Sequence, residues 1–394
     1  MFTRYLVLFF IPLSILAESK ITDAFINGNI DAEVQLFYYK IDKENKDLAY
    51  ATSLGGFLKY TTDTNNTIFA SLGFHTSNKV GNAKNERLTL LFDNDKDSNY
   101  FIANSEAFLA YETSTRVIKL GNMLLNTPMM NNDNTRIVPW SYQGFAYTGD
   151  ITADTRVQLY YINAIRSHTS NRYKKNSASG EIGHSGVSML SLHYSGMDGI
   201  MLQSYYYYAP ELYSTFVFQT DYEYSLSDTT LLCLGTQYFN SVSGGKYAKS
   251  TNIYGGDDIN LVALKANIDT DKWQLSLNYS QNFGVSGLLR GYGGLAKVYT
   301  SSMVANGRGN YKPETWMLKS SYNLPFKSYD SEIGFRLTNT KVHDSRGHGF
   351  NAYYLHYKQY FNADASLYIR YENLNFTTDK NSASFFRIIT KYRF

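Results

Sequence analysis

Two short segments of this 394-residue chain place chemically active side chains next to one another. Gly183-His184-Ser185-Gly186 brings a histidine beside a serine, the pair that a hydrolase uses as base and nucleophile. Asp93-Asn94-Asp95-Lys96-Asp97 has the alternating oxygen donors of a calcium loop, but Ser98 and Asn104 stand where glycine and glutamate are needed. Neither segment carries the rest of its motif, so we expect both to belong to solvated loops.

Other catalytic and metal-binding patterns are missing from the sequence. No Gly-x-Ser-x-Gly and no His-Glu-x-x-His sequence occurs. Cys233 is the only cysteine, which excludes an internal disulfide and a cysteine-rich metal site. With 37 basic and 34 acidic side chains, the chain lacks the strongly basic balance of a nucleic-acid binder. The sequence therefore predicts no catalytic residue, no metal site, no cofactor and no nucleic-acid partner.

The elements that must position the remaining polar side chains are strands, because apolar and polar residues alternate with period two along the chain. The clearest runs lie at 30–39, 261–268, 273–280 and 367–372. Alternation gives each strand one apolar and one largely polar face. Many runs reach the ~9–11 residues that a tilted strand needs to cross a bilayer, whereas strands of soluble proteins cluster near ~5–6 residues. A membrane barrel with its polar face inside is therefore favoured over a soluble sandwich.

The first residues indicate export. Arg4 is followed by a mostly apolar stretch at 5–16 and by Ala17, a plausible cleavage residue. This is the layout of a secretory signal peptide. We therefore expect residues 1–17 to be a signal peptide and residues 18–394 to form a single barrel domain.

Short and long connections alternate between the expected strands. Short turns are expected at 63–66, 113–114, 150–152, 196–198, 227–228, 269–271, 324–326 and 362–364, and long polar stretches at 77–99, 163–186, 240–257 and 281–314. Short periplasmic turns and long outer loops are typical of bacterial outer-membrane barrels. Eight turns, with both termini on their side, predict an all-β, antiparallel, up-and-down transmembrane barrel of about 18 strands.

The chain ends on an amphipathic strand with a terminal aromatic residue. Phe386, Ile388, Thr390, Tyr392 and Phe394 share one face. This ending resembles the recognition signal that the barrel-assembly machinery of the bacterial outer membrane reads. We expect that machinery as a partner during insertion, and outer-membrane lipids and lipopolysaccharide as the surroundings afterwards.

Aromatic residues suit the two lipid–water interfaces of such a barrel. The chain holds 36 Tyr, 24 Phe and 3 Trp. Trp273 and Trp316 are expected to begin strands beside short turns, as residues of an aromatic girdle.

Parity along the strands assigns charged side chains to the barrel interior. Basic candidates are Lys119, Arg156, Lys265, Lys319, Arg336, Lys358, Arg370, Arg387, Lys391 and Arg393, and acidic candidates are Asp31, Glu33, Asp221, Glu223 and Glu372. The bases concentrate on the C-terminal strands. The acids lie on the first strand and the middle ones. This separation of charge predicts a transverse electric field in the lumen. The alternative is that these charges only solvate the lumen and pair with one another.

Residues 118–144 carry a more specific pattern. A strand ending at Gly121 is followed by Asn126-Thr127-Pro128, Asp133, Arg136, Pro139 and Gly144. This stretch resembles the third-strand-pair loop of the OprD-like outer-membrane porins, and the segments 237–241 and 288–301 also resemble that family. The sequence departs from the family at Gly121-Asn122-Met123, where Gly-Arg-Gln is common, and at Trp140, which replaces a smaller residue.

The resemblance implies an 18-stranded barrel in which the loop at about 122–143 folds inward and narrows the pore. Asp133 and Arg136 then become the candidate residues of the constriction. We hypothesise that Arg136 attracts anions at the narrowest point, so that Arg136→Ala would change the reversal potential in a salt gradient.

A barrel of this size leaves an aqueous channel. We therefore expect a porin for passive diffusion of small hydrophilic solutes and ions, with mild selectivity for small anions, carboxylates or amino acids. The alternatives are a surface adhesin barrel, whose long loops would dominate function, and a barrel hydrolase, which needs a cluster of catalytic side chains that the sequence does not supply. The solute, and the choice between a monomer and a homotrimer, stay open at this point.

Overall fold

The computed structural model describes residues 22–65, 67–94, 99–133, 135–175, 185–210, 212–243, 259–284, 291–302, 312–326, 329–343, 348–377 and 382–394. The expected signal peptide, residues 1–17, lies outside the described residues, as do Gly183, His184 and residues 95–97. Within the described ranges, no helix has both the length and the apolar character that crossing a membrane requires.

In the described ranges a helical turn at 22–26 precedes eighteen strands, and a short 3-10 helix at Glu86–Thr89 lies between two of them. The strands are β1 (Asn29–Lys43), β2 (Ala49–Thr61), β3 (Ile68–Lys79), β4 (Ile102–Thr113), β5 (Arg116–Met123), β6 (Ser141–Thr152), β7 (Thr155–Arg166), β8 (Val187–Met197), β9 (Ile200–Tyr208), β10 (Tyr213–Ser227), β11 (Thr230–Ser243), β12 (Ile259–Thr270), β13 (Trp273–Asn282), β14 (Pro313–Phe326), β15 (Tyr329–Val342), β16 (Phe350–Tyr360), β17 (Ala365–Phe376) and β18 (Ala383–Arg393).

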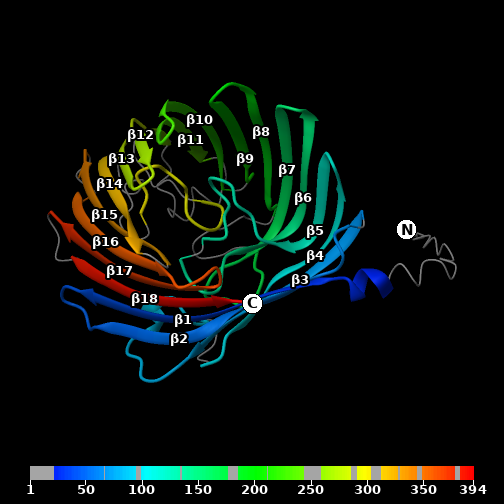
Figure 1. The fold of residues 1–394 in the computed structure, drawn as a ribbon, viewed down its shortest axis with the longest axis horizontal. Coiled ribbons are helices and arrows are strands. Elements are labelled where there is room, and N and C mark those ends of the chain that lie inside the picture. The colour runs from blue at the N-terminus through cyan, green and yellow to red at the C-terminus, as the bar shows by residue number, and fades with distance from the viewer. Residues whose placement is uncertain are drawn as a thin grey trace, which may run out of the picture.

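Each strand pairs antiparallel with its neighbours in sequence, and β1 pairs with β18, so the sheet closes on itself. Figure 1 shows the strands curving around an interior that holds loop segments. At the closing seam Tyr39 lies opposite Arg387 and Glu33 lies opposite Arg393. The predicted all-β, up-and-down barrel of about 18 strands is confirmed, and a barrel of 16–18 strands is wide enough to leave a channel.

Eight short connections lie at one end of the barrel, where they join β2 to β3, β4 to β5 and so on to β16 and β17. Six of the predicted short turns fall on these connections, but 150–152 and 324–326 were placed too early, since β6 continues to Thr152 and β14 to Phe326. The start of β1 and the end of β18 lie at this same end, where Arg393 bonds to Asp31. The other end carries the long connections, together with shorter ones at 44–48, 209–212, 343–349 and 377–382. This asymmetry is typical of outer-membrane barrels.

The outer face is apolar and carries aromatic rings near both ends. Leu36 on β1 and Leu120 on β5 are exposed, whereas Phe37 and Tyr39, which point inward, are buried. Trp273 packs against Tyr322 with ring centroids 4.5 Å apart and the rings tilted by 44°, beside the short turn before β13. Trp316 packs against Tyr279 in a similar tilted arrangement at 4.5 Å, but β14 begins at Pro313, after a long connection. The prediction that Trp316 lies beside a short turn is therefore wrong, since it sits at the opposite rim.

Candidate constriction site

The segment 124–140, between β5 and β6, crosses the barrel interior. Near one end of it the guanidinium of Arg136 lies 4.9 Å from the centre of the Tyr39 ring on β1. Near the other end the backbone N–H of Met129 donates to the Tyr207 hydroxyl on β9 at 3.3 Å. Because β1 and β9 lie almost opposite each other in the ring of strands, one segment that touches both must span the lumen.

A second segment, 291–302, also enters the interior and binds to the first. The backbone nitrogen of Tyr292 donates to the Met129 carbonyl at 2.7 Å, and that of Lys297 donates to the Pro128 carbonyl at 2.9 Å. In Figure 1 both segments, one cyan to green and one yellow, lie inside the ring of strands. We call 124–140 and 291–302 the two constriction segments.

Asn131 is the main link between the constriction segments. Its amide nitrogen donates to the Leu295 carbonyl at 2.5 Å, and its amide oxygen accepts from the Leu295 nitrogen at 3.3 Å. The Tyr142 hydroxyl donates to the Asn131 carbonyl at 2.8 Å. Gly294, with φ +71°, fits against Asn131 because a side chain there would overlap the Asn131 oxygens. Glycine adopts this left-handed backbone without steric cost.

A stack of tyrosine rings anchors the second segment to the wall. Ring centroids are 5.4 Å apart for Tyr207 and Tyr292, and 4.6 Å apart for Tyr292 and Tyr213. The Tyr292 hydroxyl donates to the Tyr213 carbonyl at 3.0 Å, and the Tyr213 hydroxyl donates to the Gly291 carbonyl at 3.1 Å. Stacked, buried rings whose hydroxyls are hydrogen-bonded hold a loop firmly.

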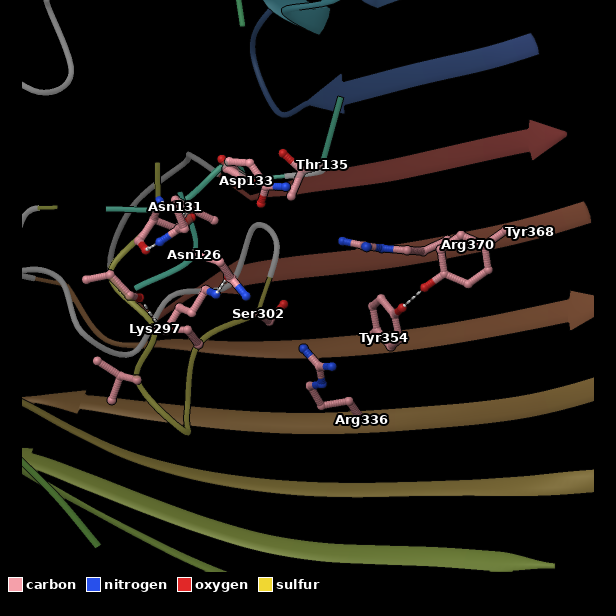
Figure 2. Close-up of a pocket in the computed structure, with 15 residues that line it drawn as sticks. Asn126, Asn131, Asp133, Thr135, Lys297, Ser302, Arg336, Tyr354, Tyr368 and Arg370 are labelled. Carbon is pink, nitrogen blue, oxygen red and sulfur yellow. Dashed lines mark hydrogen bonds between the residues drawn. The ribbon is translucent and has the colours of Figure 1, made fainter. Parts of the chain in front are cut away.

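A cavity of about 680 Å³ opens between the constriction segments and the C-terminal strands. The segments contribute Asn126, Asn131, Asp133, Thr135, Lys297 and Ser302, and the wall contributes Arg336, Tyr354, Tyr368 and Arg370. Figure 2 shows the two sets on facing sides, with Arg370 and Arg336 extended into the space between them. A solute that passes on this side of the segments meets a wall of guanidinium and phenol groups.

Tyr354 on β16 separates the two arginines of this wall. The guanidinium groups of Arg336, on β15, and Arg370, on β17, each lie 4.8 Å from the centre of its ring. Its hydroxyl bonds to that of Tyr368 at 2.5 Å. The ring thus makes a cation–π contact with one guanidinium from each neighbouring strand. Arg370 also pairs with Glu372 at 3.3 Å.

Tyr39 on β1 likewise contacts two arginines, Arg387 and Arg136, by cation–π interactions. The guanidinium of Arg387, on β18, lies 4.1 Å from the Tyr39 ring centre and donates to its hydroxyl at 2.7 Å. Arg136 approaches the same ring from the constriction segment and donates to the Thr89 carbonyl at 2.8 Å. Four arginines, held by two tyrosines, therefore follow one another around this side of the pore.

The two predicted constriction residues lie on the first constriction segment. Burial acts to raise the pKa of the Asp133 carboxyl, but the hydrogen bond and charge of His168, and the charge of Arg136, outweigh it and lower that pKa overall. Burial lowers the pKa of Arg136, although Tyr39 and Asp133 oppose the shift. Arginine stays charged at any physiological pH. The constriction thus contains an ionised acid and an ionised base.

Several predicted wall residues form ion pairs nearer the turn end of the barrel. Lys391 pairs with Glu33 at 3.1 Å and Arg393 with Asp31 at 2.9 Å across the closing seam. Arg156 is exposed and pairs with Asp150 at 2.7 Å. Such exposed pairs contribute little to stability.

The remaining predicted wall residues are spread around the barrel. Lys265 pairs with Asp221 at 2.8 Å, and Asp221 also accepts from the Tyr299 hydroxyl of the second constriction segment at 2.9 Å. Lys119 lies over the Phe108 ring at 4.8 Å and Lys358 over the Tyr360 ring at 4.4 Å. Glu223 is exposed at the turn end of β10. Of the predicted residues, the structure gathers Asp133, Arg136, Arg336, Arg370, Glu372 and Arg387 at the constriction.

The second constriction segment and the two tyrosines Tyr39 and Tyr354 did not enter the predicted site. The run Gly291-Tyr292-Gly293-Gly294 was a usable signal, because Gly293 and Gly294 have φ +102° and +71° and mark a tight, special backbone. In the part of the chain that the structure describes, no three His, Cys, Asp or Glu side chains gather as metal ligands.

The model of the outer membrane porin, OprD family, matches residues 66–330, which is more than half of the chain. The chain belongs to the OprD family of outer-membrane porins. The resemblance seen in the 118–144 stretch is thereby confirmed. A search of curated proteins gives no match.

Solved structures of related barrels have the same fold. Acinetobacter baumannii OccAB2 superposes with a TM-score of 0.81 at 15% identity, covering 94% of this chain and 99% of that one. Pseudomonas aeruginosa OccK8 (OprE) gives 0.79 at 12% identity, with coverage of 94% and 99%. Pseudomonas aeruginosa OpdK with vanillate gives 0.74 at 14% identity, with coverage of 93% and 98%. This OprD-family chain is thus a multi-pass β-barrel of the bacterial outer membrane and a channel for small solutes.

Proposed function

We propose that this OprD-family porin conducts small anions, and small carboxylates in particular, in preference to cations. The observation that carries the proposal is a set of buried guanidinium nitrogens without a hydrogen-bond acceptor among the described residues: Nε of Arg336, and Nε and Nη1 of Arg387. Buried donors of this kind normally have partners. A carboxylate that enters the cavity meets the guanidinium groups of Arg336 and Arg370, which line it, and supplies two acceptor oxygens that match the arginine fork.

The charge balance around the constriction supports the same preference. Four arginines and Lys297 surround the passage, against the carboxylates of Asp133 and Glu372. On the wall, Lys319 of β14 lies directly opposite Arg336 of β15 in the sheet register. Like charges directly opposite each other destabilise a sheet. A wall that keeps this arrangement gains by binding an anion.

The solute class follows from the chemistry of the cavity. A space of about 680 Å³ admits a small organic acid, and the rings of Tyr354 and Tyr368 offer an apolar edge beside the guanidiniums. Vanillate, the compound named with the OpdK structure, is an aromatic carboxylate. We therefore propose aromatic and short aliphatic carboxylates as solutes of this chain, carried by passive diffusion with no catalytic step.

The test is the reversal potential of single channels in a potassium chloride gradient, for the wild type, Arg387→Gln, Arg370→Gln and Arg136→Ala. Removing one positive charge about 7 Å from a passing ion changes the occupancy of each ion by about threefold in opposite directions, and so the anion-to-cation ratio by about sevenfold, at the dielectric of water. Arg156→Gln is the matched control, because Arg156 is exposed at the turn end and paired with Asp150. An unchanged ratio in all three constriction variants would refute the proposal.

Residence of the solute is a second measurement in the same recordings. Vanillate or benzoate added on one side should interrupt the wild-type current, and the interruptions should shorten several-fold in Arg370→Gln, because Arg370 lines the cavity, but not in Arg156→Gln. Interruptions of equal length in both variants would exclude Arg370 from carboxylate binding. A homotrimer predicts currents that appear in three equal steps, and a monomer predicts single steps.

We also propose that the C-terminal strand is recognised by the barrel-assembly machinery and that lipopolysaccharide surrounds the outer rim. Phe394 is 72% exposed at the end of the chain and is therefore available for recognition. Phe394→Ala should reduce the amount of folded barrel that the machinery inserts into vesicles, with little change in the heat stability of the inserted protein. Equal insertion of both proteins would argue against recognition of this residue.

A further inference from the structure

His168 is a buried histidine that the proposed anion pathway does not use. It lies in the segment between β7 and β8, and only 8% of its surface is exposed. Its ring packs edge-on against Trp140, with centroids 5.6 Å apart. Trp140 and Asp133, the two side chains that its Nε2 touches, both belong to the first constriction segment.

The hydrogen bonds around the imidazole ring exceed what one protonation state can satisfy. Nδ1 lies 3.0 Å from the Val138 carbonyl, which only accepts, so Nδ1 carries a hydrogen. Nε2 then lies near two groups with opposite hydrogen-bonding needs, a donor and an acceptor. The Trp140 indole N–H donates to it at 2.9 Å, and the Asp133 carboxylate oxygen, an acceptor, lies 3.1 Å away.

Each protonation state of the ring satisfies one of these two neighbours. In the neutral ring Nε2 has a lone pair, accepts from Trp140 and repels the lone pairs of the Asp133 oxygen. In the imidazolium Nε2 carries a hydrogen, donates to Asp133 and leaves the Trp140 N–H without its acceptor. Both neighbours are within bonding distance, so the exchange requires only small movements.

We infer that His168 is a positioning residue of the constriction. When it takes up one proton from solvent, its Nε2 exchanges Trp140 for Asp133 as its hydrogen-bond partner. The exchange forms the Nε2–H···O bond to Asp133 and breaks the Trp140 N–H···Nε2 bond. Histidine is the side chain whose charge ordinarily changes between about pH 5 and 8.

The exchange changes the charge next to the pathway. Asp133 lines the cavity beside the arginine wall. When His168 is neutral, Asp133 adds a negative charge there; when His168 is protonated, the pair has no net charge. The consequence for transport rests on the proposed function: anion preference rises as the pH falls through the protonation of His168.

Other charged groups near His168 and Asp133 come from each of the neighbouring segments. Arg136 lies on the same constriction segment and Lys297 on the second one, and both act on Asp133. Arg166 is buried at the end of β7, two residues before His168, and donates to the Ser167, Ser170 and Pro139 carbonyls. Tyr173 follows on the same segment and bonds to Ser141, and Asp93 stands next to Asn94, whose nitrogen donates to the Thr169 carbonyl.

The first test follows the Trp140 N–H directly and does not depend on transport. Trp273→Phe with Trp316→Phe leaves Trp140 as the only tryptophan, and both replaced residues lie on the outer face. In this background the resonance Raman band that reports indole N–H hydrogen bonding should change in one single-proton step between pH 8 and 5. His168→Gln, which keeps a donor and an acceptor but does not titrate there, should abolish the step.

Further variants separate this role from a merely structural one. Asp133→Asn removes the charge that favours the imidazolium, so the step should move to lower pH by about one unit. Trp140→Phe removes the bond that favours the neutral ring, so the matching step in reversal potential should move up by about half to one unit. His193→Gln, a change at a wall histidine on β8 that contacts Tyr205, is the matched control and should leave both steps in place.

The outcomes distinguish the inference from the proposed function. A Trp140 spectrum that is constant from pH 8 to 5, or a step that survives His168→Gln, overturns the partner exchange. A spectral step without any step in reversal potential supports the exchange and overturns its effect on ion preference. Steps in both measurements, with the predicted shifts in Asp133→Asn and Trp140→Phe, support both.

Discussion

Gly294→Ala is the sharpest test of how the constriction is held. Gly294 has φ +71°, and a methyl group there would overlap both the carbonyl and the amide oxygen of Asn131. A left-handed backbone costs a non-glycine residue roughly 1 kcal/mol. The overlap also displaces Asn131, which bonds twice to Leu295 and accepts from Tyr142.

The expected cost is about 4 kcal/mol, because each of these three hydrogen bonds contributes about 1 kcal/mol beyond the backbone strain. The equilibrium between docked and undocked constriction segments should therefore shift by about a thousandfold. The strands do not include Gly294, so the barrel itself should stay closed. The separated segments should leave a wider and less selective pore.

Gly81→Ala is the matched control. Gly81 has φ +70°, almost the same backbone, but no atom lies within 4 Å of the position its methyl group would take. It should therefore lose only about 1 kcal/mol from the backbone and keep the wild-type pore.

The assay is single-channel conductance in planar bilayers, with the mobility shift on heating as the measure of a folded barrel. Gly294→Ala should give a larger conductance with more frequent current fluctuations, and Gly81→Ala should behave as the wild type. If both variants conduct like the wild type, the Asn131 link does not hold the constriction. If both fail to form heat-modifiable barrels, the positive-φ glycines serve folding and the reasoning about docking is wrong.

Two further predictions concern the same constriction. Tyr292→Phe deletes a buried hydroxyl that donates to the Tyr213 carbonyl at 3.0 Å. The loss should cost about 1–2 kcal/mol and increase the frequency of current fluctuations, whereas Tyr224→Phe on the outer face should not. Equal fluctuation in the two variants would argue against Tyr292 as the anchor of the second constriction segment. Asp133 has a lowered pKa, since the hydrogen bond and charge of His168 and the charge of Arg136 outweigh burial, so its contribution to docking is fully present above the ordinary carboxyl range and is lost as the pH falls through the lowered native value. Fluctuation frequency should thus not rise between neutral pH and about pH 4.5 and should rise only in stronger acid, and Asp133→Asn should remove that rise; a rise already at pH 6 would contradict the assignment.

The sequence by itself determined the barrel. Alternating apolar and polar residues, eight short turns and an amphipathic last strand are local features, and each has a direct structural consequence because successive side chains of a strand point to opposite faces. The same logic failed for Trp316, which lies at the rim of the long connections. Strand boundaries beside a long loop have no turn residues to mark them, and β14 begins at Pro313, before the Trp316 that was expected to start it.

Parity also brought Arg336, Arg370 and Arg387 to the inner wall, and the 118–144 pattern brought Asp133 and Arg136 to the pore. What these residues contact could not be predicted. Tyr39 lies 348 positions from Arg387 in the sequence, and nothing in either strand alone indicates that one ring receives two guanidiniums. Such contacts depend on ring closure, which joins the first strand to the last.

Only the tertiary structure decided the shape of the constriction. Asn131 and Leu295 meet across 164 positions, and His168 meets Asp133 and Trp140 from another connection. Strand periodicity carries no information about which loops fold into a lumen or which side chains they join there. The physical reason is that a loop is held by a few hydrogen bonds and ring contacts to distant residues, whereas a strand is set by its own alternating pattern and its nearest neighbours.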